Sequence, residues 1–204
     1  MSLHKKYVYL VDDDDGLRHS LQATLSFVGY TVYSYANPES FLKELKPLAP
    51  AVLVADMRMP EKSGVELQAE MLARGFKLPI IFISGHSSGE QIVRAFKNGA
   101  IDFLLKPFGR EIFLTTVAKA IEKDAIAMQD LIQKNQLSEA LRALSPRERQ
   151  VFDLLAKGYG NKELVETLGV TLYTAKEYKS TVMCKLQLRT LSELISLNNF
   201  LNRS

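Results

Sequence analysis

The sequence is poor in several features that mark secreted and membrane proteins. Cys184 is the single cysteine among 204 residues, so no intrachain disulfide can form, which is typical of proteins of a reducing cytoplasm. No run of about 18 apolar residues is present, as a membrane-spanning helix would need. The N-terminal residues show no small-residue cleavage pattern, so no signal peptide is expected. We therefore predict a cytoplasmic protein that does not associate with membranes.

The charged residues are distributed unevenly along the chain. Residues 1–139 contain 16 Lys and Arg against 17 Asp and Glu, a net charge of −1. Residues 140–204 contain 10 against 6, a net charge of +4, and the two parts together give the overall +3. A near-neutral first part and a basic second part predict two modules, of which the second binds a polyanion. The chain length is suited to two small domains.

Up to Phe108, two kinds of segment alternate. Short apolar runs rich in β-branched and aromatic residues are separated by longer stretches with helical spacing. Strands that alternate with helices need crossover connections, which give a mostly parallel sheet. The runs are apolar enough to be covered on both faces. This pattern predicts a doubly wound α/β domain with five parallel strands, at residues 7–11, 31–35, 51–55, 79–84 and 102–105.

A different pattern follows Phe108. No Gly or Pro interrupts "EIFLTTVAKAIEKDAIAMQDLIQKNQLSEALRAL", which predicts a long helix joining the two halves, although the sequence leaves its continuity open. From Ser145 onward the spacing is helical throughout, in four short segments. We predict a first domain over residues 1–124, a linker helix over 125–142 and an all-α domain over 143–204.

Four consecutive carboxylates, Asp12 to Asp15, follow the first apolar run in "VYLVDDDDGLR". Taken alone, such an acidic run is most simply a solvated turn. Ligands of an open parallel sheet, however, bind at the carboxyl ends of its strands. Polar residues at the ends of the other predicted strands therefore belong to the same edge of the sheet as the acidic run. The residues predicted to converge there are Asp12, Asp13, Asp56, Ser84 and Lys106.

These residues form a chemically consistent set. Three carboxylates packed together repel one another unless a cation joins them. Oxygen ligands without His or Cys favour Mg²⁺, and Lys106 would meet further negative charge brought to the site. A carboxylate beside a metal ion, an ammonium and a hydroxyl is suited to accept a phosphoryl group. Asp14 and Asp15 are expected to begin the next helix, where negative charge is favourable.

Four motifs, "VDD", "DMRMPEKSG", "ISGH" and "KPF", occur in this order. Through them, residues 6 to about 125 resemble the receiver domain of two-component response regulators, which has a flavodoxin-like fold. The resemblance implies that Asp56 accepts a phosphoryl group from the phosphohistidine of a partner sensor histidine kinase. It further implies that Asp13, Asp56 and the backbone carbonyl of Arg58 ligate Mg²⁺, and that Asp12 holds the ion through water.

The resemblance also implies a switch at this site. Lys106 would pair with the phosphoryl oxygens, and the Lys106–Pro107 peptide bond would be cis. Ser84 would move toward the phosphoryl group and Phe103 would rotate inward, which would alter the face formed by the fourth helix and the fifth strand. A plain core role for Phe103 is the alternative. Arg58 and His86, two residues beyond Asp56 and Ser84, would line the approach of water to the phosphoryl group.

The second half contains helix-start signals that predict a helix-turn-helix. Residues 144–148, "LSPRE", form a capping box with Pro at the first helical position. Asn161 is predicted to cap the next helix, which Gly169 ends. Thr171 is predicted to cap the third helix of this half, which would lie in the major groove of DNA.

That third helix has two contrasting faces. An apolar stripe of Ala175, Tyr178, Val182 and Leu186 would face the core. On the other side, Lys176 and Glu177 are suited to read base edges, because Lys donates to guanine and Glu accepts from cytosine. Asn161, Lys162 and Lys179 are better suited to contact phosphates. A solvated face of an ordinary amphipathic helix is the alternative. The predicted DNA-binding residues are Asn161, Lys162, Tyr173, Lys176, Glu177, Lys179 and Ser180.

Residues 144 to about 197 resemble the LuxR-type DNA-binding domain through "LSPRERQV", "NKEL" and "TAKEYKSTVMCKL". Behind a receiver domain, this resemblance identifies the chain as a member of the FixJ/NarL group of response regulators. Four residues depart from the usual pattern of the family: Tyr178 replaces His, Val165 replaces Ala, Ala175 replaces Val, and Leu191 stands where Arg is frequent. We hypothesise that Val165 and Ala175 compensate each other in size within the core.

The resulting prediction is a phosphorylation-dependent transcription factor and not a metabolic enzyme. Its expected cofactor is Mg²⁺, and its expected partners are a sensor histidine kinase, a double-stranded DNA operator and a second copy of the chain after phosphorylation. RNA polymerase is a further candidate partner. A phosphatase or phosphotransferase with an Asp nucleophile is one alternative, but Met57 and Arg58 follow Asp56, where such enzymes usually place an acid. A regulator that binds DNA without phosphorylation is the other alternative.

Overall fold

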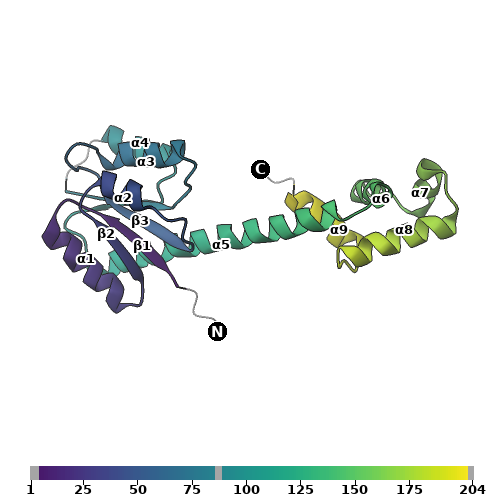
Figure 1. Cartoon of the computed structure of the whole chain (residues 1–204), viewed down its shortest axis with the longest axis horizontal. Helices are drawn as coiled ribbons and strands as arrows, with labels where there is room; N and C mark the ends of the chain where they lie inside the picture. The colour runs from purple at the N-terminus through teal and green to yellow at the C-terminus, as the bar shows by residue number, and fades with distance from the viewer. Residues whose placement is uncertain (1–4, 86–88, 202–204) are drawn as a thin grey trace. The chain divides into compact units, whose positions relative to one another are not determined.

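The computed structural model describes residues 5–85 and 89–201 of the chain. These residues fold as two compact units that divide after Met128, and Figure 1 labels the helices and some of the strands. The long helix α5 contributes to both units and runs without interruption from Arg110 to Arg142. The continuity that the sequence left open is thus resolved in favour of one helix.

The first unit contains a five-stranded parallel sheet with the strand order β2-β1-β3-β4-β5. The order reverses between β1 and β3, which is where ligands of such sheets bind. The observed strands agree with the predicted ones to within one residue at their ends. Their bounds are β1 Tyr7–Val11, β2 Thr31–Tyr35, β3 Ala51–Asp56, β4 Ile80–Ser84 and β5 Asp102–Leu105.

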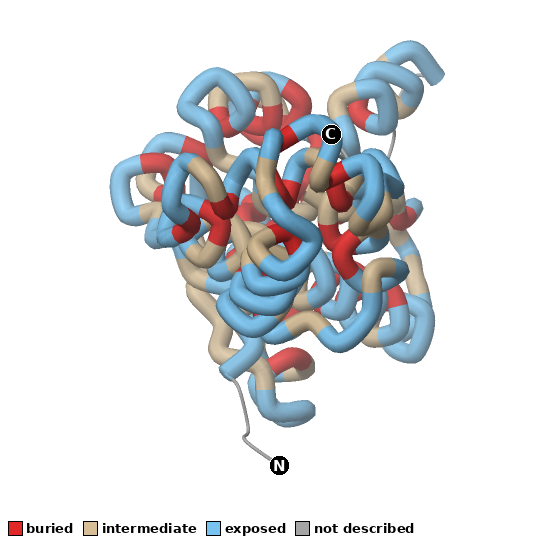
Figure 2. The backbone as a smooth tube through the Cα atoms, turned by 90° about the vertical axis from the view of Figure 1, so that its right-hand side faces the viewer, coloured by how far each residue is buried: buried red, intermediate tan, exposed pale blue. Residues whose placement is uncertain are grey.

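Helices cover both faces of the sheet, as the apolar strands require. The cluster on one face takes side chains from α2, α3 and α4, and the cluster on the other takes them from α1 and α5. Every residue of β3 is buried, and Figure 2 marks buried backbone in red. The predicted doubly wound α/β class is therefore confirmed. The helix bounds are α1 Asp15–Phe27, α2 Pro38–Glu44, α3 Gly64–Ala73 and α4 Gly89–Lys97.

The second unit is entirely helical and has its own core. Leu141 in the last turn of α5 and Leu144, two residues after its end, pack with side chains from the four following helices. The core includes fully buried Val151, Leu155 and Val182, so this unit buries apolar surface independently of the sheet. The helix bounds are α6 Pro146–Ala156, α7 Asn161–Leu168, α8 Leu172–Lys185 and α9 Leu191–Leu201.

The helix starts follow the capping chemistry of the sequence with one exception. Asp14 caps α1 by accepting a hydrogen bond from the Leu17 N–H at 3.0 Å, and Ser145 and Glu148 form the predicted capping box of α6. The prediction that Asn161 caps α7 is wrong. Gly160 is the cap residue, because its extended backbone offers an N–H that the Glu163 carboxylate accepts at 3.0 Å.

Candidate phosphoryl-acceptor site and DNA-binding surface

Three of the predicted side chains meet at the carboxyl edge of the sheet. The Lys106 Nζ lies 2.6 Å from Oδ1 of Asp56 and 3.1 Å from Oδ2 of Asp12. Asp12 directly follows β1, Asp56 ends β3, and Lys106 directly follows β5. Asp12 and Asp56 are 0% and 5% exposed, so the ammonium joins two buried carboxylates from strands on either side of the switch point.

The remaining carboxylate oxygens are held by backbone groups. Oδ1 of Asp12 accepts the Asp14 N–H at 2.8 Å, and Oδ2 of Asp56 accepts the Arg58 N–H at 2.7 Å. The Arg18 guanidinium donates to the backbone carbonyl of Asp12 at 2.8 Å. Each buried carboxylate is therefore oriented by at least one main-chain hydrogen bond and by the same lysine.

Burial and charge pairing act in opposite directions on these groups. Burial raises the pKa of Asp12, although its hydrogen bonds from Asp14 and Lys106 act to lower it. For Lys106, burial alone would lower the pKa, but the hydrogen bonds to Asp56 and Asp12 outweigh burial and raise it. Lys106 thus stays charged at neutral pH and is the resting countercharge of the two acids.

The other predicted residues lie in different environments. Asp13 and Arg58 are exposed, while Ser84 is 1% exposed at the end of β4. The backbone carbonyl of Ser84 accepts the Lys106 N–H at 2.8 Å, which fixes the ends of β4 and β5 to each other. Phe103 is half-buried and packs against the core cluster beneath α2, α3 and α4. His86 lies outside the residues that the structure describes.

The donor set at this edge fits a Mg²⁺ ion. Within residues 5–85 and 89–201, no three acidic, His or Cys side chains are grouped as a preformed metal cage. Mg²⁺ needs no such cage, because it usually keeps several waters and takes only one or two protein carboxylates. Mg²⁺ prefers hard oxygen ligands. The site offers the exposed carboxylate of Asp13, the buried carboxylate of Asp56 and the main-chain oxygen of Arg58.

Sequence reasoning missed one residue of the site, Gly64 at the start of α3. A Cβ added at Gly64 would lie 2.5 Å from the backbone oxygen of Asp56 and 2.9 Å from the ring of Phe82. The Gly64 N–H also donates to the carbonyl of Met57 at 3.1 Å. Only a residue without a side chain lets α3 begin this close to the acceptor strand. The glycine that ends the motif "EKSG" was the sequence feature that could have indicated this residue.

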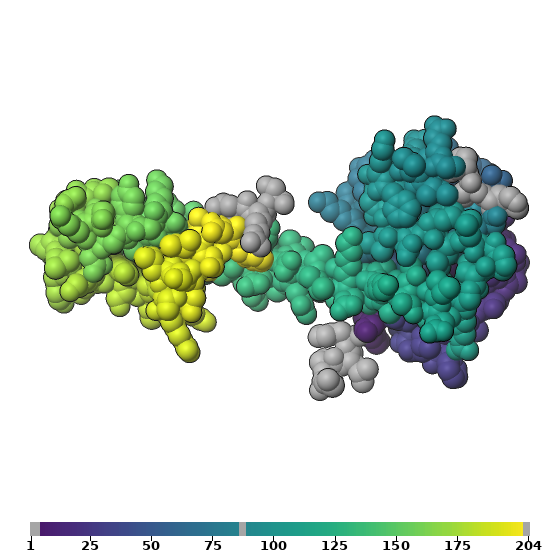
Figure 3. Space-filling view, turned by 180° about the vertical axis from the view of Figure 1, so that it is seen from behind, coloured from purple at the N-terminus to yellow at the C-terminus, as the bar shows by residue number. Residues whose placement is uncertain are grey.

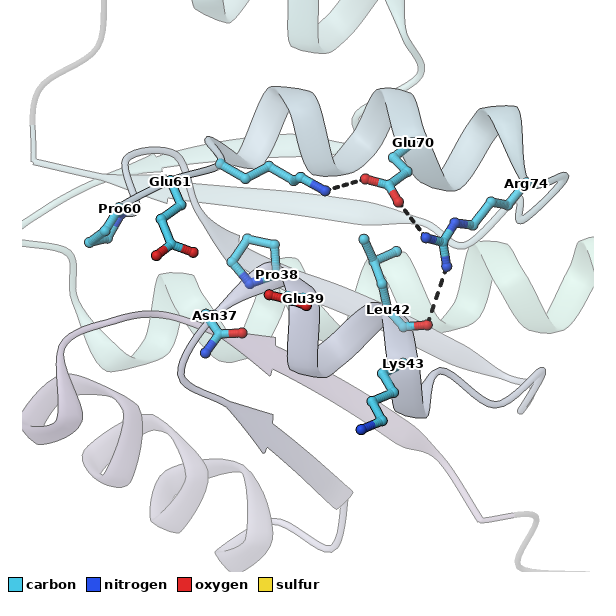
Figure 4. A pocket seen from close by; sticks show the side chains of 10 residues that line it. Asn37, Pro38, Glu39, Leu42, Lys43, Pro60, Glu61, Glu70 and Arg74 are labelled. Atoms are coloured by element: carbon cyan, nitrogen blue, oxygen red, sulfur yellow. Dashed lines mark hydrogen bonds and ion pairs between the residues drawn. The ribbon is translucent and has the colours of Figure 1, made fainter.

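A network of ion pairs holds the loop that follows the acceptor strand. Lys62 in this loop pairs with Glu70 of α3, and Glu70 also pairs with Arg74. Arg74 in turn donates to the carbonyl of Leu42 in α2 at 3.5 Å. Figure 4 shows these groups along a hollow of about 460 Å³ between α2, the loop and α3. The loop that carries Arg58 is therefore tied to both neighbouring helices.

In the second unit, α7 and α8 form the predicted helix-turn-helix. The Arg147 guanidinium donates to the carbonyl of Leu168 at 2.6 Å, at the end of α7. Glu148 lies 2.8 Å from the Lys185 ammonium, which links the start of α6 to the last turn of α8. This pairing and the hydrogen bonds from Ser145 lower the pKa of Glu148. The two contacts fix α7 and α8 to one common helix, α6.

The predicted DNA-binding side chains lie mostly on the open side of this motif. Tyr173 is 72% exposed, and Lys162, Lys176, Glu177 and Ser180 are exposed as well. Asn161 and Lys179 are half-buried. Of the predicted apolar stripe, Ala175, Val182 and Leu186 are buried in the core of the second unit, and Tyr178 packs against that core. The helix α8 is thus amphipathic in the predicted sense.

The departures from the usual LuxR pattern are accommodated in the same core. Val165 and Ala175 both pack there, Ala175 with no exposure and Val165 in part, as the hypothesis of size compensation requires. Tyr178 and Leu191 are also partly buried against the core. At these two positions the chain therefore uses packing where the family often has a polar side chain.

Comparison with known proteins assigns both units. Residues 8–118 match the response regulator receiver domain family, and residues 142–198 match the family of bacterial regulatory proteins of the luxR type. The chain belongs to the two-component response regulators of the FixJ/NarL group. It is a phosphorylation-dependent transcriptional regulator, and its two domains imply a histidine kinase partner and DNA targets.

Similar proteins match along almost the whole chain. Nodulation protein W of Bradyrhizobium diazoefficiens is 36% identical over 200 residues, which cover 98% of this chain and 88% of that protein. Transcriptional regulatory protein FixJ of the same organism is 34% identical and covers 95% of this chain and 94% of its own length. The structure of the response regulator StyR matches with a TM-score of 0.83 and 35% identity, covering 96% of this chain and 99% of that one.

These relationships settle the broad class of the protein. The chain is a transcriptional response regulator, and receiver domains in general use Mg²⁺ in phosphorylation. Among the helices formed by residues 5–85 and 89–201, none combines the length and the apolarity needed to cross a bilayer.

Proposed function

We propose that Asp56 is the phosphoryl acceptor of the regulator. The carboxylate would attack the phosphorus of a kinase phosphohistidine, so that a P–O bond forms while the P–N bond breaks and the imidazole leaves. The observation that supports this assignment is the position of Asp56, which is buried at the strand end, is oriented by the Arg58 N–H and lies 2.6 Å from Lys106.

Asp13, Asp56 and the backbone carbonyl of Arg58 would hold Mg²⁺, with Asp12 holding the ion through water. When bound, the ion would neutralise charge on the phosphoryl oxygens. Lys106 would exchange its resting contact with Asp56 for a phosphoryl oxygen, because the new anion carries more charge than the carboxylate it replaces. The same groups would support the later hydrolysis of the acyl phosphate, so the receiver catalyses only its own phosphorylation and dephosphorylation.

Ser84 and Phe103 would transmit the effect of phosphorylation from the site to the face of α4 and β5. The backbone carbonyl of Ser84 accepts the Lys106 N–H where β4 and β5 end. We propose that the Ser84 hydroxyl binds a phosphoryl oxygen while Phe103 turns inward. The face of α4 and β5 carries Val93, Phe96 and Leu105, which are 54%, 46% and 60% exposed. Apolar side chains at such a face support its use as the dimerising surface of the phosphorylated receiver.

In this proposal a dimer brings two DNA-binding domains to an operator with two-fold symmetry. Lys176, Glu177, Tyr173 and Ser180 of α8 would read the major groove, while Asn161, Lys162 and Lys179 would contact phosphates. RNA polymerase is the further partner proposed at target promoters, and the cytoplasm is the proposed compartment, because the DNA lies there. The proposed domain limits are 1–124 for the receiver, 125–142 for the linker and 143–204 for the DNA-binding domain.

The decisive experiment is a DNA-binding titration with and without a phosphoryl donor, at stated salt because phosphate contacts make affinity salt-dependent. We expect tighter operator binding and a higher dimer content in sedimentation after phosphorylation of the wild type, and neither change in Asp56→Asn. Equal operator affinity in both forms would favour a regulator that does not depend on phosphorylation. Turnover of a small phosphate ester well above one per chain would favour the phosphatase alternative instead.

A further inference from the structure

The middle of α5 carries an unusual density of exposed apolar side chains. Ile126, Met128, Leu131 and Ile132 are 54%, 38%, 59% and 45% exposed, although they lie within seven consecutive residues. Figure 3 shows this part of α5 at the molecular surface in green. Where exposed apolar side chains share one face of a helix, they mark a surface that binds another protein.

The spacing of these residues selects one helix face. Met128 and Asn135 are seven residues apart, and Leu131 and Ser138 follow each of them by three, which places the four at a and d positions of a heptad repeat. Ile132 flanks the same stripe. Leu137 and Ala140 lie on the other side of the helix and pack into the core of the second unit. Ile126 also points away from the stripe, since it occupies an f position.

Charged residues beside the stripe indicate what binds there. Lys134 and Glu139 occupy successive g and e positions, five residues apart. In a parallel pair of identical helices, Lys134 of one copy faces Glu139 of the other, whereas an antiparallel pair would place like charges together. Asn135 at an a position is the residue type that favours two parallel strands in register. The stripe is thus complementary to itself.

We infer that residues 128–139 of α5 form a short parallel coiled coil with a second copy of this chain. This inference rests on the proposed function, because it extends the dimer of the phosphorylated receiver along the linker. Two heptads with Asn135 and Ser138 in the seam are too weak to hold a dimer alone. Once the receivers pair, the helices are at high effective concentration and the seam closes. The coiled coil would then set the register of the two DNA-binding domains.

The first test compares two equally exposed positions. Leu131→Lys places a charge in the seam, while Ile126→Lys places the same charge on the outer side of the helix. With Mg²⁺ and beryllium fluoride as the phosphoryl analogue, sedimentation should give a dimer constant roughly tenfold weaker for Leu131→Lys and unchanged for Ile126→Lys. Equal dimerisation of both variants and the wild type overturns the inference, while the proposed function stands. A wild type that stays monomeric under these conditions contradicts the proposed function itself.

The second test addresses the register without any phosphoryl analogue. Asn135→Leu removes the polar group from the seam, so dimer content of the unphosphorylated chain should rise. Lys134→Glu and Glu139→Lys should each weaken dimerisation of the Asn135→Leu chain, and the two together should restore it. Recovery of dimerisation in the double variant is the result that decides the test. Lys134 also lies 5.5 Å over the ring of Phe200, and a defect caused only by loss of that contact would remain in the double variant. Failure of the double variant to recover, or no dimer in Asn135→Leu, overturns the inference.

Discussion

The ammonium of Lys106 lies 2.6 Å from the carboxylate of Asp56, although 50 residues separate the two in the chain. The same ammonium also contacts Asp12 at 3.1 Å. One cation therefore balances two buried acids that come from neighbouring strands. In the resting regulator this pairing holds the Asp56 carboxylate beside a cation at the strand end. It also gives Lys106 a position from which a small movement reaches a phosphoryl oxygen.

Replacing this cation should slow phosphorylation. Lys106→Gln keeps a polar side chain, one atom shorter than lysine, but removes the charge, so the transition state loses a positioned counterion. We expect phosphoryl incorporation from a small donor to fall by roughly 100-fold, by analogy with the loss of one preorganised donor. Lys77→Gln, which changes an exposed lysine, is the matched control and should behave as the wild type. Incorporation in Lys106→Gln within twofold of the control would exclude the proposed role.

Gly64 should be intolerant of even a methyl group. A Cβ there would lie 2.5 Å from the Asp56 carbonyl oxygen, which is main chain and has no freedom to rotate away. We expect Gly64→Ala to lower the free energy of unfolding by about 1–3 kcal/mol and to reduce phosphorylation, because the acceptor strand must shift. At Gly109 a Cβ would meet nothing within 4 Å. Gly109→Ala is therefore the matched control, and its urea unfolding and phosphoryl incorporation should equal those of the wild type.

Much of this site follows from the sequence, because strand ends of a parallel sheet share one edge. Reading the polar residue after each apolar run was sufficient to assemble Asp12, Asp56, Ser84 and Lys106 at that edge. The pattern of apolar runs alone did not show which of Asp12 and Asp13 is buried; only the resemblance to receiver domains gave the two different roles. Burial of Asp12 and exposure of Asp13 depend on how the end of β1 packs against α1 and β3. The spacing of apolar residues in the sequence does not specify that packing.

Other features depended on contacts between distant segments. The cap of α7 was assigned one residue too late, since an Asn is a good cap and a Gly is a weaker signal. The reach of Glu163 back to Gly160 decides the matter in favour of the glycine. The requirement for a glycine at Gly64 comes from the close Asp56 carbonyl oxygen; the motif "EKSG" contains this glycine but does not show which atom it must avoid.

Asp124 of α5 should make the receiver sensitive to pH. Its carboxylate accepts the N–H of Ala51 at 2.8 Å, at the start of β3, and burial raises its pKa above the ordinary 3.8. For an acid whose pKa is raised by folding, the stabilisation is fully present below the unfolded pKa and is lost as the pH rises through the folded pKa. Asp124→Asn keeps an acceptor but never ionises, so at neutral pH it should be at least as stable as the wild type.

Two further observations complete this prediction. The stability difference between Asp124→Asn and the wild type should shrink as the pH falls toward 4, because the wild-type carboxyl then becomes neutral as well. Asp124→Leu leaves the buried Ala51 N–H without its acceptor and should cost about 1–3 kcal/mol at any pH. Urea unfolding across this pH range is the measurement. An Asp124→Asn variant that is less stable than the wild type at neutral pH would contradict the assignment.

In the second unit, a lysine on α8 and a lysine on α7 should respond differently to substitution. Lys176 lies on the exposed face next to Glu177, whereas Lys162 stands at the start of α7. If Lys176 reads a base, Lys176→Ala should cost about 1–3 kcal/mol on a selected operator and relax the preference at one base pair. If Lys162 contacts a phosphate, Lys162→Ala should weaken all sequences alike and reduce the salt slope by about 1. Fluorescence anisotropy with single-base operator variants at several salt concentrations separates base contacts from phosphate contacts. An equal loss of affinity for Lys176→Ala on every sequence would assign Lys176 to the DNA backbone instead.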